Sequence, residues 1–578
     1  MTIKRRLMLH ALVPLLLAGS ATLLAAQQPD ASAPSISPQD LARMAATTQG
    51  GSTSYEPVAR EVDLDALPTA TAAELAHVTT LRPRDGRTDA QYAAMKRQAA
   101  LLGGNRAPLS PGPAPSKSST YLTVSNVFRG QGENCCTPSD MALAVSPSWV
   151  VQFVNTSIAV YAKNGVLQAG YPKSATAFFG LPTGTYTTDP RGFFDWTNNR
   201  FVFVMLTESS FSSNNVGRLM VAVSKTSNPT GGWNIFMFQV GATGECPDYP
   251  TLGHDSNNWG KNATRGAIYI GINQFANNCN GGFIQNYMFV IPKDAVYNGT
   301  GMYRMWFFNF NVGGTLVDTI QASNPAQPGD RPSASYWTNT FNILWNCGAG
   351  CANMVIWSVN NVAAFTTGGP LPTVAAVIVP TTHTYFYPPS ANQPGAPNSI
   401  ETIDVRITGS MWYNAGRLFG SFETGVPNVP GAHPIWFEYH PILDGNSNIT
   451  GASKELQEDC FFCGGQGTNG SAYFATLQPD PENNVIMTYT YSDDNIYPEF
   501  AVTGRRVSLG DSVMNGPGFA FGIAGGLYNQ FRWGDYSATA PDLTFPSAPR
   551  MWASGMTDNA GAWGTIISAQ GYPKPPDQ

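Results

Sequence analysis

The sequence predicts an all-β fold, and three observations support this. From about residue 120 onward the chain consists of short apolar and aromatic runs separated by Gly, Asn, Pro and Asp. Glycine and proline, the main turn formers, account for 58 and 44 of the 578 residues. No amphipathic helical pattern interrupts the runs over roughly 400 residues, which excludes an α/β fold.

The apolar runs have the length and composition of β-strands. They are rich in Val, Ile, Phe and Tyr and are bounded by turn residues. Strands are predicted at 149–154, 201–206, 219–223, 267–272, 354–359 and 485–491.

A unit recurs along this region: an acidic residue, a turn, and then a strand with aromatic residues. Its predicted starts are Asp140, Asp189, Asp248, Asp330, Asp404, Asp480 and Asp535. A four-stranded propeller blade takes about 40 to 50 residues plus loops. The repeat therefore predicts a single β-propeller, with seven blades as the natural count and six or eight left open. Residues 121–128 are expected to close the ring by pairing with the last strand, near Ile567.

The first 26 residues have the pattern of a secretory signal peptide. Lys4, Arg5 and Arg6 precede an apolar stretch that ends at Ala26, with Ala25-Ala26-Gln27 as a cleavage site. A membrane anchor is the alternative, because the stretch is barely long enough to span a bilayer. We expect a secreted or periplasmic protein with no membrane span after signal cleavage.

Residues 27–102 are expected to form a helical or disordered leader. Helical patterns run over 37–46 and 89–102, with Asp89 as a candidate N-cap. Residues 103–119 are a Pro/Gly/Ser linker, 120–570 the propeller and 571–578 a tail. The leader has little apolar surface, which favours a spacer or pro-segment over a cap on the main domain.

The even number of cysteines indicates disulfides in an exported chain. The candidates are Cys135, Cys136, Cys246, Cys279, Cys347, Cys351, Cys460 and Cys463. Two close pairs, Cys347 with Cys351 and Cys460 with Cys463, would each close a small loop. A zinc site or a redox pair at 460–463 is the alternative, and the full connectivity stays open.

Net charge is −6, and no basic block follows the first residues, so we expect no nucleic-acid partner. The oxygen-rich cluster Asp493-Asp494-Asn495 offers a calcium site, with a solvated turn as the alternative.

Several motifs resemble those of a family of bacterial secreted β-propeller proteins, which open with Pro-Asp and Ala-Val-Gly-Pro. The matching stretches are 140–155, Asp189-Pro190-Arg191 with Asp195, 222–233, Asp248-Tyr249-Pro250, Tyr497-Pro498 with Gly504-Arg505, and Arg532-Trp533-Gly534-Asp535-Tyr536. The resemblance covers about 121–570. It implies a propeller fold, whereas most members have no assigned activity and some are described as sialidase-like. This chain departs from the pattern after the last motif, where the expected Cys is missing.

Acidic and basic residues at the unit starts are predicted to ring the central channel. The candidate ligand-binding residues are Asp189, Arg191, Asp404, Arg406, Arg532 and Asp535. Such a ring suits an anionic or hydroxyl-rich ligand. The architectural alternative is stronger, because an Asp repeated in every blade can accept backbone N–H groups of the next blade.

Catalytic residues should instead break the repeat, as His254, Glu401, Glu438 and His440 do. Glu438 follows Trp436, and an indole beside a carboxylate is a common sugar-binding arrangement. A glycosidase would pair Glu438 with a channel Asp such as Asp248. A lyase would use His254 or Tyr249 as the base and Arg191 to neutralise a uronate.

Export, aromatic loops and a polar channel together favour a propeller that engages an extracellular glycan, with glycoside hydrolase and polysaccharide lyase as the enzyme classes. A non-enzymatic surface, adhesion or scaffold propeller is the alternative.

Overall fold

The structure is a computed structural model, and it describes residues 44–572 except 52, 76–84, 105–121, 133–138, 183–184, 212–213, 256–265, 331, 363–370, 461–468, 508–512, 522–525, 546–547 and 560. The predicted signal peptide, most of the predicted linker and the predicted tail from 573 onward lie outside these residues. So do Cys135, Cys136 and Cys463, as well as the side chain of Cys460.

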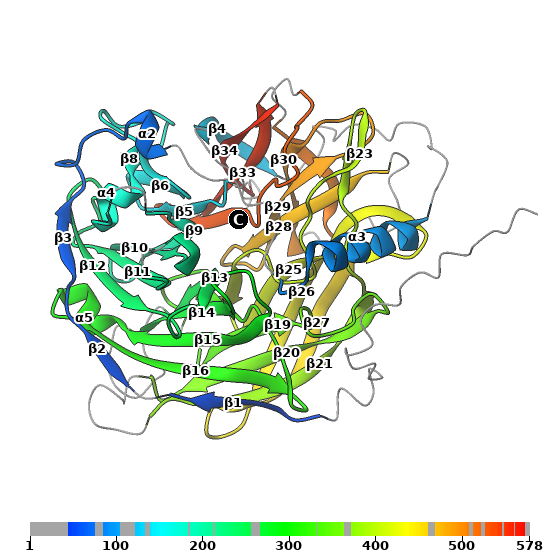
Figure 1. Ribbon diagram of the computed structural model, residues 1–578, viewed down its shortest axis with the longest axis horizontal. Helices are drawn as coiled ribbons and strands as arrows, with labels where there is room; N and C mark the ends of the chain where they lie inside the picture. The colour runs from blue at the N-terminus through cyan, green and yellow to red at the C-terminus, as the bar shows by residue number, and fades with distance from the viewer. Residues whose placement is uncertain are drawn as a thin grey trace, which may run out of the picture.

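The fold is mostly β, with antiparallel sheets arranged around a common centre (Figure 1). The first three sets of consecutive strands are β5 (Ala142–Val145), β6 (Trp149–Val154), β7 (Ser157–Ala162) and β8 (Lys173–Ser174); β9 (Thr188–Asp195), β10 (Arg200–Thr207), β11 (Arg218–Ser224) and β12 (Gly232–Gln239); and β13 (Cys246–His254), β14 (Ala267–Phe275), β15 (Phe283–Pro292) and β16 (Met302–Val312).

The sets that follow are β18 (Gln321–Pro325), β19 (Ser335–Thr340), β20 (Cys351–Asn360) and β21 (Thr373–Tyr385); β24 (Met411–Asn414), β25 (Arg417–Val426), β26 (Val429–Leu443) and β27 (Ile449–Cys460); and β28 (Ser471–Pro479), β29 (Val485–Ser492), β30 (Glu499–Arg505) and β31 (Asn515–Ala520). The innermost strands β18 and β24 pair in parallel, so two of these sets are joined edge to edge.

The last set combines the two ends of the region. It contains β32 (Ala538–Asp542), β33 (Arg550–Asn559), β34 (Ala562–Gly571) and β4 (Thr123–Gly132). β4 pairs with β34, with Phe128 opposite Ile567, which confirms the predicted closure. Closing the ring in this way removes the free edges that an open sheet would expose.

The smaller elements lie between or beside these sets. They are β17 (Thr315–Leu316), the hairpin β22 (Ala391–Gln393) and β23 (Ala396–Ile400), the helices α4 (Ala175–Phe179) and α5 (Lys293–Asn298), and the 3₁₀ turn η1 (Ser209–Phe211).

The core lies between neighbouring sheets. In one cluster, Val204 and Phe236 from the second set pack with Ile270 and Phe289 from the third. The predicted strands are confirmed because their apolar residues are buried on both faces, as sheets stacked between neighbours require.

The feature that repeats from sheet to sheet is a backbone conformation, and its positions coincide with only some of the predicted unit starts. A residue with a left-handed backbone stands at or near the start of most inner strands, at Asp140, Asp189, Tyr249, Thr319, Ile403 and Phe474, with φ between 31° and 57°. Asp330 and Asp480 are not starts. Asp330 lies between β18 and β19, and Asp480 closes the β28–β29 turn by accepting the N–H groups of Glu482 and Asn484.

Part of the expected helical or disordered leader forms strands. β1 (Ala46–Gly50) and β2 (Ser54–Glu56) pair with β16, and β3 (Arg60–Asp63) pairs with β12. Each extends the outer edge of a sheet, where the neighbouring strand supplies the hydrogen bonds that these short polar segments lack alone.

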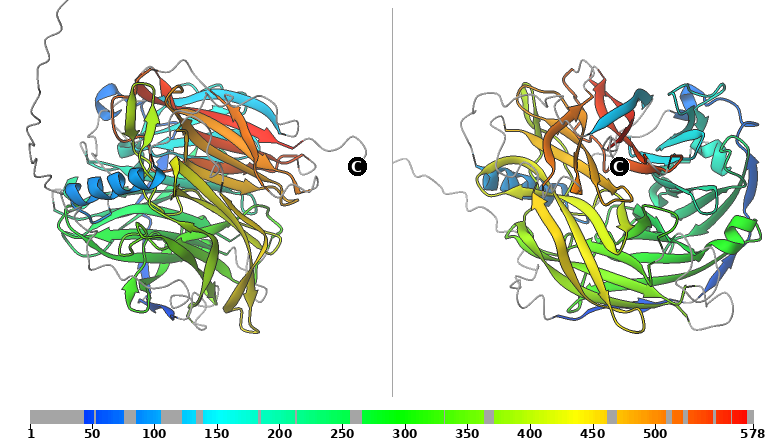
Figure 2. Two further views of the ribbon diagram at one scale, coloured as in Figure 1. Left: turned by 90° about the vertical axis from the view of Figure 1, so that its right-hand side faces the viewer. Right: turned by 180° about the vertical axis from the view of Figure 1, so that it is seen from behind.

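The leader also contains α2 (Ala72–Leu75) and α3 (Asp89–Gly103). The predicted helix at 89–102 is confirmed, although its N-cap is Thr88, which forms a capping box with Gln91. Figure 2 shows α3 on one face of the ring only.

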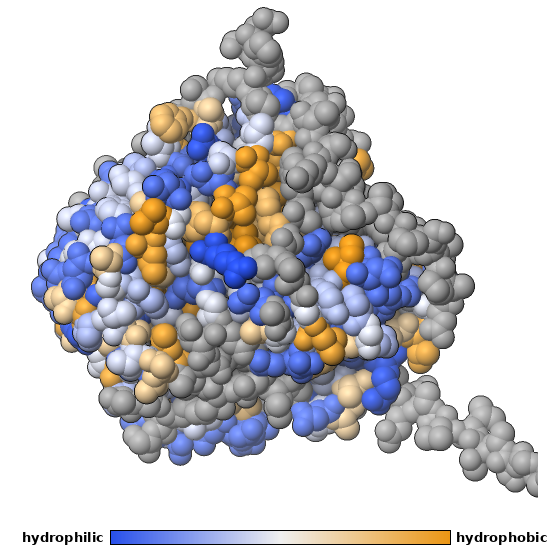
Figure 3. All heavy atoms as spheres, turned by 90° about the horizontal axis from the view of Figure 1, so that it is seen from above, coloured by the Kyte–Doolittle hydropathy of each residue, from blue (hydrophilic) through white to orange (hydrophobic). Residues whose placement is uncertain are grey.

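Two disulfides are present, Cys246–Cys279 and Cys347–Cys351, and the second is the predicted small loop. They match an oxidising compartment. Among the described residues, no helix is long and apolar enough to cross a membrane. Figure 3 shows apolar side chains on the upper surface in separate groups among polar ones.

Candidate functional site

The central channel has two ends with different contents. We call the end where the innermost strands begin the strand-start mouth, and the end where they finish the strand-end mouth. The innermost strands are β5, β9, β13, β18, β24, β28 and β32.

The strand-start mouth is filled by its own side chains. The Arg191 guanidinium carbon lies 3.2 Å from the ring centre of Tyr536, and that of Arg406 lies 4.5 Å from the ring centre of Tyr249. The Tyr249 hydroxyl donates to the carbonyl of Asp535 over 3.1 Å. These predicted ligand-binding residues are therefore brought together, but as a packed plug.

The acidic side chains of this mouth connect neighbouring blades. Asp140 accepts the N–H of Asp535 at 3.0 Å, and Asp189 accepts the N–H of Tyr249 at 3.0 Å. Asn155 bridges two blades: its amide nitrogen donates to Asp140, and its oxygen accepts the N–H of Asp189. The left-handed residues turn their N–H groups toward these acceptors, so the hydrogen bonds match the architectural alternative.

Two buried ion pairs complete the strand-start mouth. Arg406 binds Asp404 through Nε and Nη2 at 2.8 and 2.7 Å, and Arg532 binds Asp535 at 2.7 Å. Burial raises the pKa of Asp404, but Arg406 lowers it more, leaving it at about 2.

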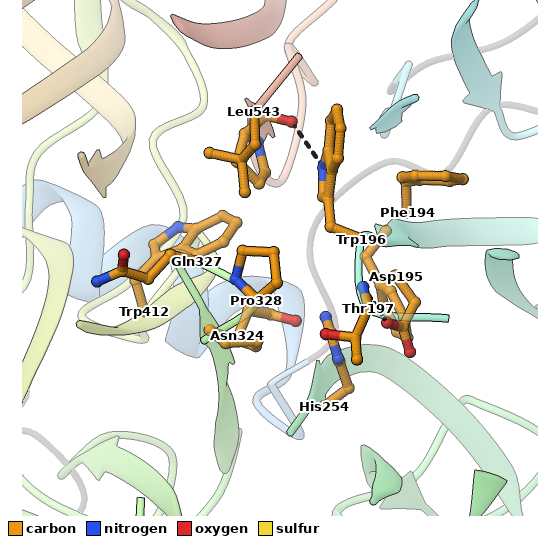
Figure 4. A pocket seen from close by; sticks show the side chains of 13 residues that line it. Phe194, Asp195, Trp196, Thr197, His254, Asn324, Gln327, Pro328, Trp412 and Leu543 are labelled. Carbon is orange, nitrogen blue, oxygen red and sulfur yellow. Dashed lines mark hydrogen bonds between the residues drawn. The ribbon is translucent and has the colours of Figure 1, made fainter. Parts of the chain in front are cut away.

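The strand-end mouth contains a narrow hollow that opens to solvent and encloses about 20 Å³, room for a single water molecule. It is lined by the ends of several inner strands and the turns that follow them: Phe193, Phe194, Asp195, Trp196, Thr197, His254, Asn324, Pro325, Gln327, Pro328, Trp412, Pro541 and Leu543. Figure 4 shows Trp196 and Trp412 on opposite sides of this hollow, which we call the Trp196–Trp412 hollow.

Trp196 is placed by the turn between β9 and β10. Asp195 closes that turn by accepting the N–H groups of Thr197 and Asn198, both at 3.0 Å. The indole N–H of Trp196 donates to the carbonyl of Pro541 over 3.1 Å (Figure 4). The ring is therefore fixed in orientation while it remains partly exposed.

A buried polar network lies behind the hollow. The Lys293 ammonium donates to Asp195 Oδ2 at 2.6 Å, to the carbonyl of Asp255 at 2.5 Å and to His254 Nδ1 at 3.0 Å. Tyr297 donates to the same Asp195 oxygen at 2.8 Å. Burial raises the pKa of Asp195, but Lys293 and His254 lower it more, so that it stands at about 2.

The network fixes the protonation of His254. Burial, followed by the charge of Lys293, lowers the pKa of His254 to about 3, so the ring is neutral near pH 7. His254 Nδ1 also lies 3.1 Å from the carbonyl of Asp255, which a proton on Nδ1 could reach. That carbonyl already accepts from Lys293, and a proton on Nδ1 would face the ammonium 3.0 Å away, so we assign the ring proton to Nε2 and make Nδ1 an acceptor. Phe193 stacks on the imidazole at 3.9 Å and holds its plane. His254 thus presents a hydrogen-bond donor, not a base.

Asn324 supplies the complementary acceptor. Its amide nitrogen donates to the carbonyls of Leu252 and Met411 at 3.2 and 3.4 Å, which fixes the amide orientation. Its Oδ1 is buried and has no hydrogen-bond partner among the described residues. His254 and Asn324 thus line the hollow together with Trp196, which is partly exposed, and Trp412, which is 3% exposed.

Glu438 and Trp436 lie elsewhere. Glu438 is fully buried on β26 between Arg417 at 2.6 Å and Arg505 at 2.8 Å. Arg505 stands over the Trp436 ring, which has no exposed surface for stacking. The structure does not bring Glu438 together with His254, and Glu438 has the surroundings of a structural ion pair.

The remaining candidates are also placed. Asp248 lies on β13 beside Tyr249, and His440 is exposed on β26. In the proposed calcium cluster, Asp493 Oδ1 accepts the N–H groups of Asn495 and Ile496 at 2.7 Å, as a turn does.

Trp196, Asn324 and Trp412 were not among the residues singled out from the sequence. They come from three different inner strands or their turns, so no local spacing connects them. His254 was found because it departs from the repeated motif.

No family model and no curated protein matches this chain. Solved structures give distant similarities. An ulvan lyase of polysaccharide lyase family 25, described with bound -[GlcA(1-4)Rha3S]-, is 11% identical over 76% of this chain and 95% of its own, with a TM-score of 0.33. A Hadza microbial sialidase, Hz136, is 10% identical over 63% of this chain and 65% of its own, with a TM-score of 0.28. A protein of unknown function from Dyadobacter fermentans is 11% identical over 68% of this chain and 96% of its own, with a TM-score of 0.29. At these values no family is assigned, and no activity of this chain follows from the likeness.

Proposed function

We propose that this protein is a secreted, seven-bladed β-propeller that binds a saccharide unit of an extracellular glycan over the opening of the Trp196–Trp412 hollow, against the exposed part of Trp196. One observation carries the proposal: the partly exposed indole of Trp196 borders one hollow together with His254 and with Asn324, whose buried Oδ1 has no hydrogen-bond partner among the described residues. A sugar hydroxyl both donates and accepts, and its C–H faces pack on aromatic rings.

Recognition fits this geometry better than hydrolysis. A glycosidase uses two carboxylates about 5 to 9.5 Å apart. The Asp195 carboxylate that lines the hollow is already engaged by Lys293, Tyr297 and the turn N–H groups. The strand-start acids are likewise engaged in blade contacts, which supports a binding role.

A glycan panel tests the proposal. We expect binding that Trp196→Ala weakens about fivefold or more, since one stacked ring contributes about 1 kcal/mol or more. The matched control is Trp306→Ala, an indole on the outer strand β16 away from the hollow. Equal affinity of the two variants, or no binding by the wild-type protein to any glycan, would contradict the proposal.

The same panel separates binding from turnover. New reducing ends would indicate hydrolysis, and unsaturated products absorbing in the ultraviolet would indicate a lyase. We expect neither, and catalytic turnover that depends on the hollow would replace recognition with an enzymatic function.

A further inference from the structure

The leader helix α3 reaches into the strand-start mouth through Lys96, beside Tyr92, which is also buried and interacts electrostatically with Glu401. Lys96 is 8% exposed, and its ammonium lies 3.0 Å from Glu401 Oε1, 3.0 Å from Thr402 Oγ1 and 3.1 Å from the carbonyl of Pro388. It also donates to the carbonyl of Ile403. We call these four acceptors the Glu401 cage. All four belong to the propeller.

The cage is held in shape by the propeller itself. The N–H groups of Thr402 and Ile403 donate to Glu401 Oε1 at 2.9 and 2.6 Å. Thr402 Oγ1 donates its proton to the carbonyl of Pro389 over 2.8 Å, so its lone pair faces the ammonium. The Glu401 N–H is bonded to the carbonyl of Phe531. None of these bonds needs Lys96.

The buried charges at the strand-start mouth are also unbalanced, with more acidic than basic side chains. The buried acids of the propeller here outnumber the buried guanidinium groups: Glu401, Asp404, Asp318, Asp140, Asp189 and Asp535 against Arg191, Arg406 and Arg532. Burial, reinforced by the neighbouring carboxylate of Asp535, raises the pKa of Asp140 and Asp189. Oε2 of Glu401 is buried and has no hydrogen-bond partner among the described residues.

We infer that the propeller carries, at its strand-start mouth, a preformed binding site for a primary ammonium group, and that Lys96 of the leader occupies this site from within the same chain. The class of ligand follows from the donors required. A primary ammonium offers three N–H groups to a carboxylate, a hydroxyl and carbonyls, whereas a quaternary amine has no N–H to donate. The site is separate from the Trp196–Trp412 hollow.

The test uses full-length Lys96→Ala, which removes three methylenes and the ammonium. The probe n-propylammonium chloride has the shape of the missing atoms. We expect it to bind this variant with a dissociation constant of about a millimolar, as suits a fragment of its size, and to raise the unfolding temperature. n-Propanol, tetramethylammonium chloride and sodium chloride should give no such rise.

Two further proteins serve as controls. Wild-type protein, whose cage is filled, and Lys225→Ala, which removes an exposed lysine paired with Glu61, should not respond to propylammonium. An equal response in all three proteins, or no response of folded Lys96→Ala, would overturn the inference.

If Lys96→Ala does not fold alone, the readout becomes the yield of refolded protein. Propylammonium should then restore folding several-fold over n-propanol, and equal yields would overturn the inference. Lys96→Met, whose side chain fills the stem of the site, should show no amine response.

Discussion

The two mouths of the channel use buried charge in opposite ways. At the strand-start mouth, carboxylates bind backbone N–H groups of neighbouring blades and remain short of positive charge. At the strand-end mouth, Lys293 compensates Asp195, and His254 and Asn324 line a hollow beside the partly exposed Trp196. The difference separates assembly from recognition: the first mouth holds the ring together and the second has unused hydrogen-bonding capacity.

The largest expected effect concerns Lys293. Lys293→Met leaves the Asp195 carboxylate buried without its cation, and we expect a loss of about 3 to 5 kcal/mol in the free energy of unfolding, measured in urea. Adding Asp195→Asn should recover part of it. A loss below about 1 kcal/mol, the range of surface ion pairs, would mean that this network is not the support of the strand-end mouth.

The blade contacts come next. Asn155→Ala removes the partners of Asp140 Oδ2 and of the Asp189 N–H, and we expect it to cost about 2 kcal/mol. Asn228→Ala, at an exposed turn where the side chain accepts the Thr230 N–H, should cost less than about 1 kcal/mol. Equal shifts of the urea midpoint would contradict the role of Asn155 in joining blades.

The stability that the two mouths contribute should also depend on pH in opposite directions. On the strand-start side, burial raises the pKa of Glu423, which accepts the N–H of Ala475, to about 8. Its contribution to stability is present below pH 4.5 and is lost as the pH rises through 8. His254 has its pKa lowered to about 3, so its contribution is present above pH 6.5 and is lost as the pH falls through 3.

Variants separate these two slopes in unfolding measured from pH 3 to 9. Glu423→Gln should flatten the alkaline decline, and His254→Gln should flatten the acid decline. Exchange of the two effects, or no change in either slope, would show that the pKa values of these groups do not differ between folded and unfolded states.

The smallest effect is on ligand affinity. Because His254 is neutral above about pH 4, glycan binding should change less than twofold between pH 5 and 8. Calorimetric titrations at both pH values measure this. A tenfold change with a midpoint near 6.5 would mean that His254 titrates like an exposed imidazole and that the tautomer assigned here does not hold.

The sequence predicts the strands well, because each corresponds to a short continuous apolar run. The run Trp149–Val154, for example, has the same bounds as the observed strand β6. It does not reveal the leader strands, since Ser54–Glu56 is short and polar and is stabilised only by pairing with β16. The repeat was located imperfectly for a related reason. Its common feature is a backbone conformation, which residues as different as Asp140, Ile403 and Phe474 adopt.

The candidate site was harder to predict than the fold. His254 breaks a repeated motif and is visible in the sequence, whereas Asn324 matters only because Leu252 and Met411 bind its nitrogen and leave its oxygen unused. Glu438 lies close to Trp436 in the sequence, which suggests a sugar-binding site. In the structure its carboxylate is paired with Arg505 from another sheet. Both outcomes depend on contacts between distant strands.

Oxidative footprinting with and without the best glycan of the panel tests the difference between the mouths most directly. We predict that the ligand protects Trp196 at the strand-end mouth and leaves Leu101 of α3, which is 79% exposed, unchanged. Protection confined to α3, with Trp196 as reactive as in the free protein, would contradict this account.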